Sequence, residues 1–227
     1  MSDSTRTYAL IDQLAGDLRP VRALPSPWRR TAGWCGAVAL AVCAVAPFTD
    51  FNALAHRLAA APDLWLSLLG ALLTCVAAAA AAFATSVPGR PAWWAALPLP
   101  PLALWLGAST AGCLRPALVA WTMPEPHMHA MHCMYFIVAV SVPLAGLLGW
   151  QISRACPLRP ALTASLAGLA SAGGACVVLA LIHPFDATYS DLLAHLGAVL
   201  LVIAGVNVVR GRKQFFFEKK NQKTFTR

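Results

Sequence analysis

The sequence predicts an all-α membrane protein, a bundle of six transmembrane helices preceded by a short amphipathic helix. Of its 227 residues, 59% are apolar and only 11% are charged, and the mean hydropathy is +0.64. Soluble globular proteins contain about 25% charged residues, so the composition excludes an ordinary soluble domain. Uncharged stretches also recur along the chain at about the 20 residues that a helix needs to cross the hydrocarbon core.

The first 30 residues form a polar segment with one amphipathic helix. Its apolar positions follow the spacing of a single helical face and are Leu10, Ile11, Leu14, Ala15 and Leu18. Ser4 or Thr5 would cap this helix, and Pro20 would end it. The apolar face requires a cover, which is either the membrane surface or a protein. Because Asp12 and Asp17 disfavour an anionic membrane surface, we expect a protein partner.

Six segments follow that are free of charged residues, except for Asp191 near the start of the sixth, and each is predicted to be a transmembrane helix. They cover residues 31–49, 64–86, 91–112, 130–150, 160–182 and 190–209. The third is interrupted by Pro98, Pro100 and Pro101, so we expect a kinked helix there. In the fifth, small side chains that favour close helix packing repeat every four residues, at Ala164, Gly168, Ala172 and Cys176. The membrane domain is therefore predicted over 31–209.

The basic residues are distributed unevenly between the two sides of this bundle. One side would carry Arg6, Arg19, Arg22, Arg29, Arg30, Arg90, Arg154, Arg159 and the C-terminal cluster, and the other only Arg57 and Arg115. The positive-inside rule therefore predicts that both termini lie in the cytoplasm. The net charge of +8 is then a signal of topology, and direct binding to nucleic acid is not expected.

The C-terminal segment 210–227 differs abruptly from the rest of the chain. It contains every lysine of the protein and four of the nine phenylalanines, and it has no alanine. Such a change in composition predicts a disordered cytoplasmic tail, to which we assign no function.

The segment PEPHMHAMHCMY, residues 124–135, concentrates side chains that bind metals. If the chain is helical from position 129, then His129, His132 and Cys133 have the i, i+3, i+4 spacing of one helical face. Imidazole and thiolate ligands suit zinc, cadmium or copper, and the neighbouring methionines favour Cu(I). The alternative is an interfacial loop, because histidine, methionine and aromatic side chains are common at headgroup level. The residues themselves leave both interpretations open.

The sequence lacks the motifs of other functional classes, namely enzymes, transporters and haem proteins. We find no G-x-S-x-G, C-x-x-C or H-E-x-x-H motif and no paired carboxylates within a span, so an enzyme is not expected. No Asp, Glu, Lys, Arg or His lies deep in a predicted span, which weakens a transport function. The spacing of His132 and His195 does not call for haem ligation.

Two regions resemble the NrsF family of six-helix inner-membrane anti-sigma factors. They are LIDQLAGDLRPVRAL and the run HCMYFIVAVSVPLAGLLGWQISRACPLRPALTASLAGLASAGGA, which leads to LALIHPFD and HLG. The resemblance covers nearly all of residues 8–209. It implies a negative regulator that holds a SigF-type extracytoplasmic-function sigma factor at the bacterial inner membrane. The sigma factor would dock in helix-in-groove manner on Leu10, Ile11, Leu14, Asp17 and Leu18.

The family pattern also includes two cysteines on the outer side of the membrane. Cys133 matches the first, whereas His183 occupies the expected position of the second. This departure argues against a disulfide switch but is compatible with a metal site of Cys133, His183, His129 and His132, because imidazole replaces thiolate as a ligand. No resident cofactor is required, and the transient ion would be zinc, cadmium or copper. An external metal or oxidant would then repack the fourth and fifth helices and release the sigma factor. The alternative function is a small metal-handling membrane protein of transport or tolerance type.

Overall fold

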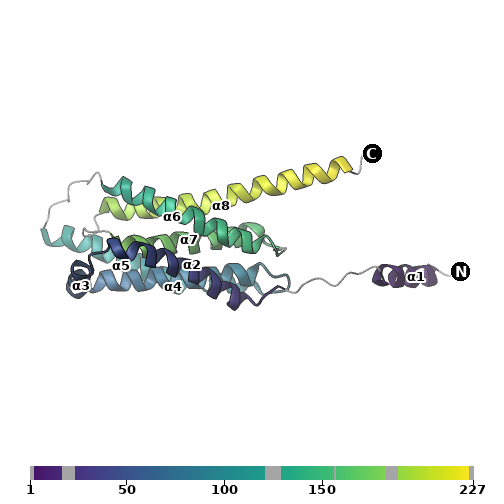
Figure 1. Cartoon of the computed structure of the whole chain (residues 1–227), viewed down its shortest axis with the longest axis horizontal. Coiled ribbons are helices and arrows are strands. Elements are labelled where there is room, and N and C mark those ends of the chain that lie inside the picture. Colours follow the sequence, from purple (N-terminus) through teal and green to yellow (C-terminus); the bar gives the residue numbers. More distant parts are fainter. Residues whose placement is uncertain (1–2, 17–23, 121–128, 156, 183–188, 225–227) are drawn as a thin grey trace.

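The computed structural model describes residues 3–16, 24–120, 129–155, 157–182 and 189–224, and all regular secondary structure in them is helical. The elements are α1 (Asp3–Gly16), α2 (Pro27–Val45), η1 (Ala46–Phe48), α3 (Phe51–Ala60), α4 (Pro62–Thr85), η2 (Ala92–Ala96), α5 (Leu99–Ala120), α6 (His129–Ile152), α7 (Pro160–Ile182) and α8 (Tyr189–Thr224). The predicted all-α class is confirmed. Figure 1 shows the long helices side by side in one bundle, with α1 apart from it.

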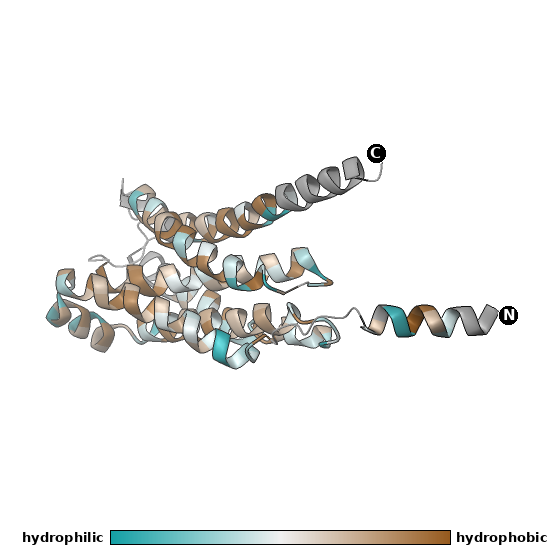
Figure 2. Cartoon of the chain, turned by 45° about the vertical axis from the view of Figure 1, so that its right-hand side comes forward, coloured by the Kyte–Doolittle hydropathy of each residue, from teal (hydrophilic) through white to brown (hydrophobic). Residues whose placement is uncertain are grey.

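Five helical segments in the described residues are long and apolar enough to cross a membrane. They are Pro27–Phe48, Pro62–Thr85, Met131–Ile152, Pro160–Ile182 and Leu192–Gly211. A further long helix, α5, has 22 residues and packs along α4. Figure 2 shows hydrophobic residues, in brown, along these helices. Large apolar side chains such as Leu40, Leu72, Val142 and Leu200 are exposed on the bundle, which is a surface suited to lipid.

Helices α4 and α7 form the centre of the bundle. They pack against each other, and α7 also contacts α2, α6 and α8. Their contact is close because small residues face each other: a Cβ placed on Gly173 would lie 3.4 Å from the Cα of Cys75. The alanine run 77–82 in α4 is almost wholly buried. Small side chains therefore pack the core, as the sequence predicts.

Polar side chains form bonds between neighbouring helices at several levels. The hydroxyl groups of Ser67 in α4 and Ser109 in α5 are 2.7 Å apart, and Asn207 of α8 donates to Ser165 of α7 over 3.1 Å. Interhelical hydrogen bonds of this kind contribute about 0.6 kcal/mol each in a membrane. They fix the register of the helices more than they stabilise the bundle.

Helix α7 approaches α8 most closely at Gly168. In a Gly168→Ala variant the new Cβ would lie 2.7 Å from the Cα of Ile203, a backbone atom that cannot move by a rotamer change. Overpacking costs about 1–3 kcal/mol, so we expect a lower midpoint of thermal unfolding in detergent, by roughly 2–4 °C per kcal/mol. The control is Gly205→Ala in α8, where a new Cβ meets nothing within 4 Å. Equal midpoints for the two variants would contradict this close contact.

The predicted kink in the third span is wrong. No α-helix runs through 91–112; η2 is followed by a turn, and α5 begins only at Leu99. Pro100 and Pro101 therefore lie in the first turn of α5, where a backbone N–H has no intrahelical partner and proline is tolerated. The first hydrogen bond of the helix runs from Leu102 N to Pro98 O over 2.9 Å. The prolines start this helix and do not bend it.

Two further elements differ from the expectation. The loop after α2 contains helix α3, which is capped by Asp50 through a 3.0 Å bond from Ala53 N and packs against α4. At the other end of the chain, α8 continues to Thr224, whereas a disordered tail was expected from position 210. The segment after Gly211 has neither glycine nor proline. Extending an existing helix is much easier than nucleating one, and this explains the difference.

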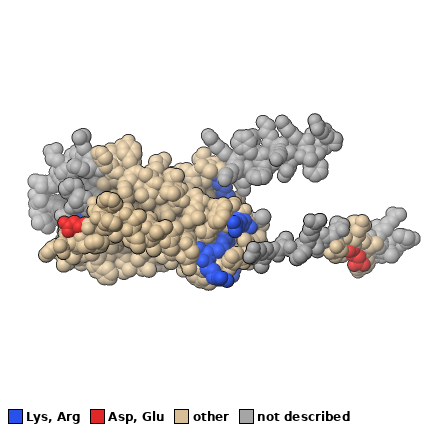
Figure 3. Space-filling view, in the orientation of Figure 1, with Lys and Arg blue, Asp and Glu red and all other residues tan. Residues whose placement is uncertain are grey.

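The described charges are distributed unevenly between the two ends of the bundle. One end, called the basic end below, carries Arg29, Arg30, Arg90, Arg154 and Arg159; Figure 3 shows basic side chains, in blue, gathered there. Asp50 and Asp63 begin α3 and α4 at the opposite end, where Arg57 of α3 also lies. Among the described residues of the basic end, no Asp or Glu occurs. This asymmetry agrees with the one on which the predicted topology depends.

Candidate functional site

Helix α1 exposes the apolar side chains that were predicted to dock a partner. Leu10 is 56% exposed and Ile11 is 53% exposed, and Tyr8, which lies one turn before Ile11, is 69% exposed. Leu14 belongs to the same helix, but its side chain lies outside the described residues, as do Asp17 and Leu18. The structure therefore brings Leu10 and Ile11 together on an uncovered helix. An apolar face without a cover marks an interaction surface.

Helix α6 begins at His129, the start that the metal-site interpretation requires, so that His129, His132 and Cys133 lie within its first two turns. Cys133 is buried, at 6% exposed, whereas His132 is exposed. These two side chains therefore point in different directions. The side chain of His129 and the whole of His183 lie outside the described residues. Within the described part of the chain, no three His, Cys, Asp or Glu side chains are grouped to hold a metal, and the predicted metal site stays a prediction.

Cys133 lies where three helices meet. Its side chain belongs to a buried cluster with Ile137 of α6, Ala175 and Leu179 of α7, and Ala198 of α8. A thiol in such apolar surroundings is shielded from bulk water, and packing around it is dense. Any ligand or chemical change at this sulfur therefore acts directly on the contacts between α6, α7 and α8.

The sequence did not predict a polar network at the basic end, which is centred on Arg30. Its side chain is only 7% exposed. One guanidinium nitrogen donates to the backbone oxygen of Gln151 in α6 over 2.5 Å, and the other donates to Ser86 Oγ, after α4, over 3.4 Å. The guanidinium also lies 4.5 Å from the ring centroid of Phe83 in α4. Arg30 thereby joins α2, α4 and α6.

Local sequence explains why Arg30 points into the bundle. Ser26 Oγ caps α2 by accepting from Arg29 N over 3.4 Å, and Pro27 occupies the first turn. The helix therefore begins four residues before the predicted span and includes Arg30. Arg30, Trp34 and Val38 recur every four residues and are all buried on one face. A capping serine before a proline indicates that the helix begins there. Together with apolar residues four and eight positions after the arginine, this pattern would have indicated that Arg30 is buried.

Trp34 fixes α2 to α6 at a second level. Its indole N–H donates to the backbone oxygen of Leu144 over 3.2 Å, within the core. Leu144 and Gln151 are seven residues apart, so their carbonyl groups lie two turns apart on the same side of α6. Pro143 lies within α6 between Cys133 and Gln151. Helix α6 thus connects the buried cysteine at one end with the Arg30 network at the other.

Comparison with known proteins adds one finding. A family model described as NrsF, negative regulator of sigma F, matches residues 14–212. No curated protein and no solved structure matches the chain. The match includes the helices from α2 to α7 and all of the apolar part of α8, Leu192–Gly211, and it begins after Leu10 and Ile11.

Proposed function

Since the chain belongs to the NrsF family, the negative regulators of sigma F, we propose that it is an anti-sigma factor that holds an extracytoplasmic-function sigma factor at the bacterial inner membrane. The observation that carries the proposal beyond the family is the uncovered apolar face of α1, with Leu10 and Ile11 more than half exposed. A cytoplasmic sigma factor would provide the groove for this face.

The charge distribution supports a cytoplasmic position for α1. The basic end of the bundle carries the arginines that the positive-inside rule places in the cytoplasm, and α2, which follows α1, begins at that end with Arg29 and Arg30. Both termini then lie on the side of the sigma factor. The helix would dock there while the bundle keeps the complex at the membrane.

Deleting residues 1–22 tests the proposal directly. The deletion removes α1 and leaves the cap of α2 at Ser26 intact, so the bundle should still insert. We expect sigma-dependent transcription to rise to the level of a strain that lacks the protein, measured with a promoter reporter. A membrane protein that handles metals would instead leave the reporter unchanged and alter cellular metal content, which would contradict the proposal.

We propose further that an external soft metal or oxidant releases the sigma factor through Cys133. The support is its position between α6, α7 and α8, where a bound ion would favour a different packing of these helices. Such a ligand must bind one arrangement better than the other. The side-chain positions expected to complete the site are His129, His132 and His183.

The double variant Cys133→Ser, His183→Ala is expected to blunt the response of the reporter to cadmium, copper or oxidants. Loss of supporting groups alone costs 10–100-fold in metal affinity, so we expect the half-maximal dose to rise at least about tenfold. Cys43→Ser is the matched control, because Cys43 is an exposed thiol in α2. An unchanged dose response in the double variant would favour the interfacial interpretation of this segment.

A further inference from the structure

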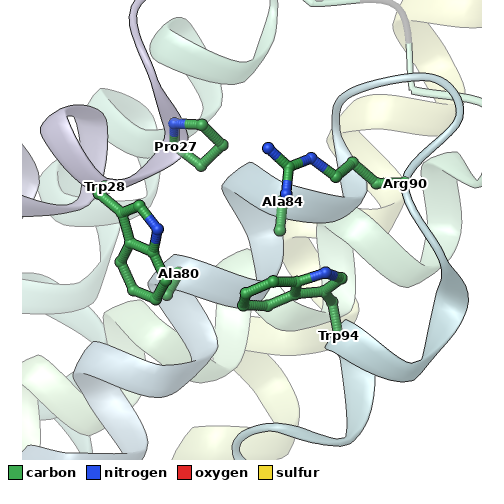
Figure 4. Close-up of a pocket in the computed structure, with 6 residues that line it drawn as sticks. All are labelled: Pro27, Trp28, Ala80, Ala84, Arg90 and Trp94. Atoms are coloured by element: carbon green, nitrogen blue, oxygen red, sulfur yellow. The ribbon is translucent and has the colours of Figure 1, made fainter.

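A small pocket opens at the basic end beside the start of α2. It is a shallow hollow of about 200 Å³, a volume that includes the open solvent at its mouth, and it is lined by Pro27, Trp28, Ala80, Ala84, Arg90 and Trp94. Figure 4 shows the Arg90 side chain reaching across the pocket toward Pro27, with the indole ring of Trp28 below Pro27 and that of Trp94 below Arg90. The pocket therefore combines one guanidinium with apolar walls.

The apolar walls are held in place by aromatic contacts. The rings of Trp28 and Trp94 meet edge to face, with centroids 5.9 Å apart, and Trp93 stacks on Trp94 at 4.7 Å. Ala80 and Ala84 of α4 are buried beneath them. Edge-to-face and offset-stacked pairs are the favourable geometries of aromatic rings. The walls of the pocket are thus built from side chains of α2, α4 and η2, and Arg90 comes from the segment between α4 and η2.

The position of the pocket places it at the depth of lipid headgroups. The membrane-spanning segments Pro27–Phe48 and Pro62–Thr85 both end beside it. Tryptophan side chains are enriched at this level because one part of the ring is apolar and the other polar. A ligand here meets hydrocarbon on one side and water on the other.

The charged residues around the pocket favour an anionic ligand. Arg90 is exposed, and in the described part of the basic end every charged side chain is an arginine. An anion for Arg90 must then come from outside this end of the bundle. The first turn of α2, which borders the pocket at Pro27, also favours a negative charge.

We propose that this pocket binds an anionic glycerophospholipid, with its phosphate at Arg90 and the beginning of its acyl chains against Trp28 and Trp94. A guanidinium offers two parallel N–H groups to a phosphate, and basic pockets between membrane helices bind anionic headgroups. This site is separate from sigma-factor docking on α1 and does not depend on it. A lipid site here makes the protein prefer anionic over neutral phospholipids around its basic end.

The test measures binding of phosphatidylglycerol to the full-length protein in detergent micelles by native mass spectrometry, with phosphatidylcholine as the neutral lipid. Wild-type protein should retain phosphatidylglycerol preferentially. One basic side chain near a membrane surface contributes about 1 kcal/mol, so Arg90→Gln should weaken phosphatidylglycerol binding about fivefold. The control is Arg159→Gln, an exposed arginine of the same end outside the pocket, which should bind as the wild type does. Equal losses in both variants would overturn the proposal.

Two further variants keep the result interpretable. Arg90→Lys retains the charge but loses the paired N–H groups, so its affinity should lie between that of the wild type and Arg90→Gln. Trp94→Leu retains the charge but removes the ring, and it should also weaken binding of phosphatidylglycerol. If Trp94→Leu binds as the wild type does, or if inorganic phosphate at equal concentration displaces the lipid, the pocket does not hold a phospholipid and the proposal is wrong.

Discussion

Replacing Ile11 by aspartate should abolish retention of the sigma factor on the membrane while leaving the protein inserted. Ile11 is half exposed on α1 and lies beside Leu10, so the substitution places a charge in the middle of the face that would be buried in the complex. The few hot-spot residues of an interface cluster near its centre, and truncating one costs about 2 kcal/mol or more. We therefore expect the sigma factor to bind at least about 30-fold more weakly. Co-purification from solubilised membranes measures the effect.

The control for this experiment is Ala9→Asp. Ala9 is also exposed on α1, but it lies two positions before Ile11, about 200° around the helix axis. Both variants therefore add one negative charge to α1, and they differ only in the face of the helix that carries it. The Ala9→Asp variant should retain the sigma factor. If the Ile11→Asp variant retains it equally well, α1 does not dock through this face.

The second large effect is expected from replacing Arg30, which lies in the first turns of α2 and is buried in the bundle. In an Arg30→Ala variant the acceptors at Gln151 and Ser86 lose their donor, and the ring of Phe83 loses its cation. Each unsatisfied buried acceptor costs about 1–3 kcal/mol. We expect a loss of about 3 kcal/mol in all, which lowers the midpoint of thermal unfolding in detergent by roughly 10 °C.

Two comparisons separate the network from the charge itself. Arg29→Ala removes an exposed arginine from the adjacent position, and surface substitutions of this kind change stability by no more than about 0.5 kcal/mol. Arg30→Met fills the vacated volume with an apolar chain and should lose less stability than Arg30→Ala. If Arg29→Ala and Arg30→Ala lower the midpoint equally, the hydrogen bonds of Arg30 contribute little.

The helix bounds were predicted best for a segment that is expected to cross the lipid bilayer. An uncharged run must be a helix of fixed length when its backbone has no water to bind, and the fifth predicted span, 160–182, has the bounds of α7. The third span was misjudged because proline is compatible either with a kink or with the first turn of a helix. Only the surrounding helices determine which of these forms.

The orientation of α6 shows what the sequence did not specify. The prediction that one helix includes both His132 and Cys133 was correct. However, α6 is apolar on nearly all sides, so the periodicity of its sequence does not indicate which face is buried. The structure buries Cys133 and exposes His132. Arg30 was overlooked because an arginine near the end of a span is usually read as a topology signal. Its burial depends on Ser86 and Gln151, which are distant in sequence.

The contacts of α2 with α6 have a mechanical consequence. Both donors, Trp34 and Arg30, bind backbone oxygens of α6, at Leu144 and Gln151, and backbone oxygens recur with every helical turn. A slide of α6 by one turn, about 5.4 Å, would bring another backbone oxygen to Trp34, but Arg30 would lose the oxygen of Gln151, which lies in the last turn of α6, where carbonyl groups have no partner within the helix. The two bonds therefore hold α6 at one position along α2, and a displacement of α6 along its axis breaks at least the bond of Arg30.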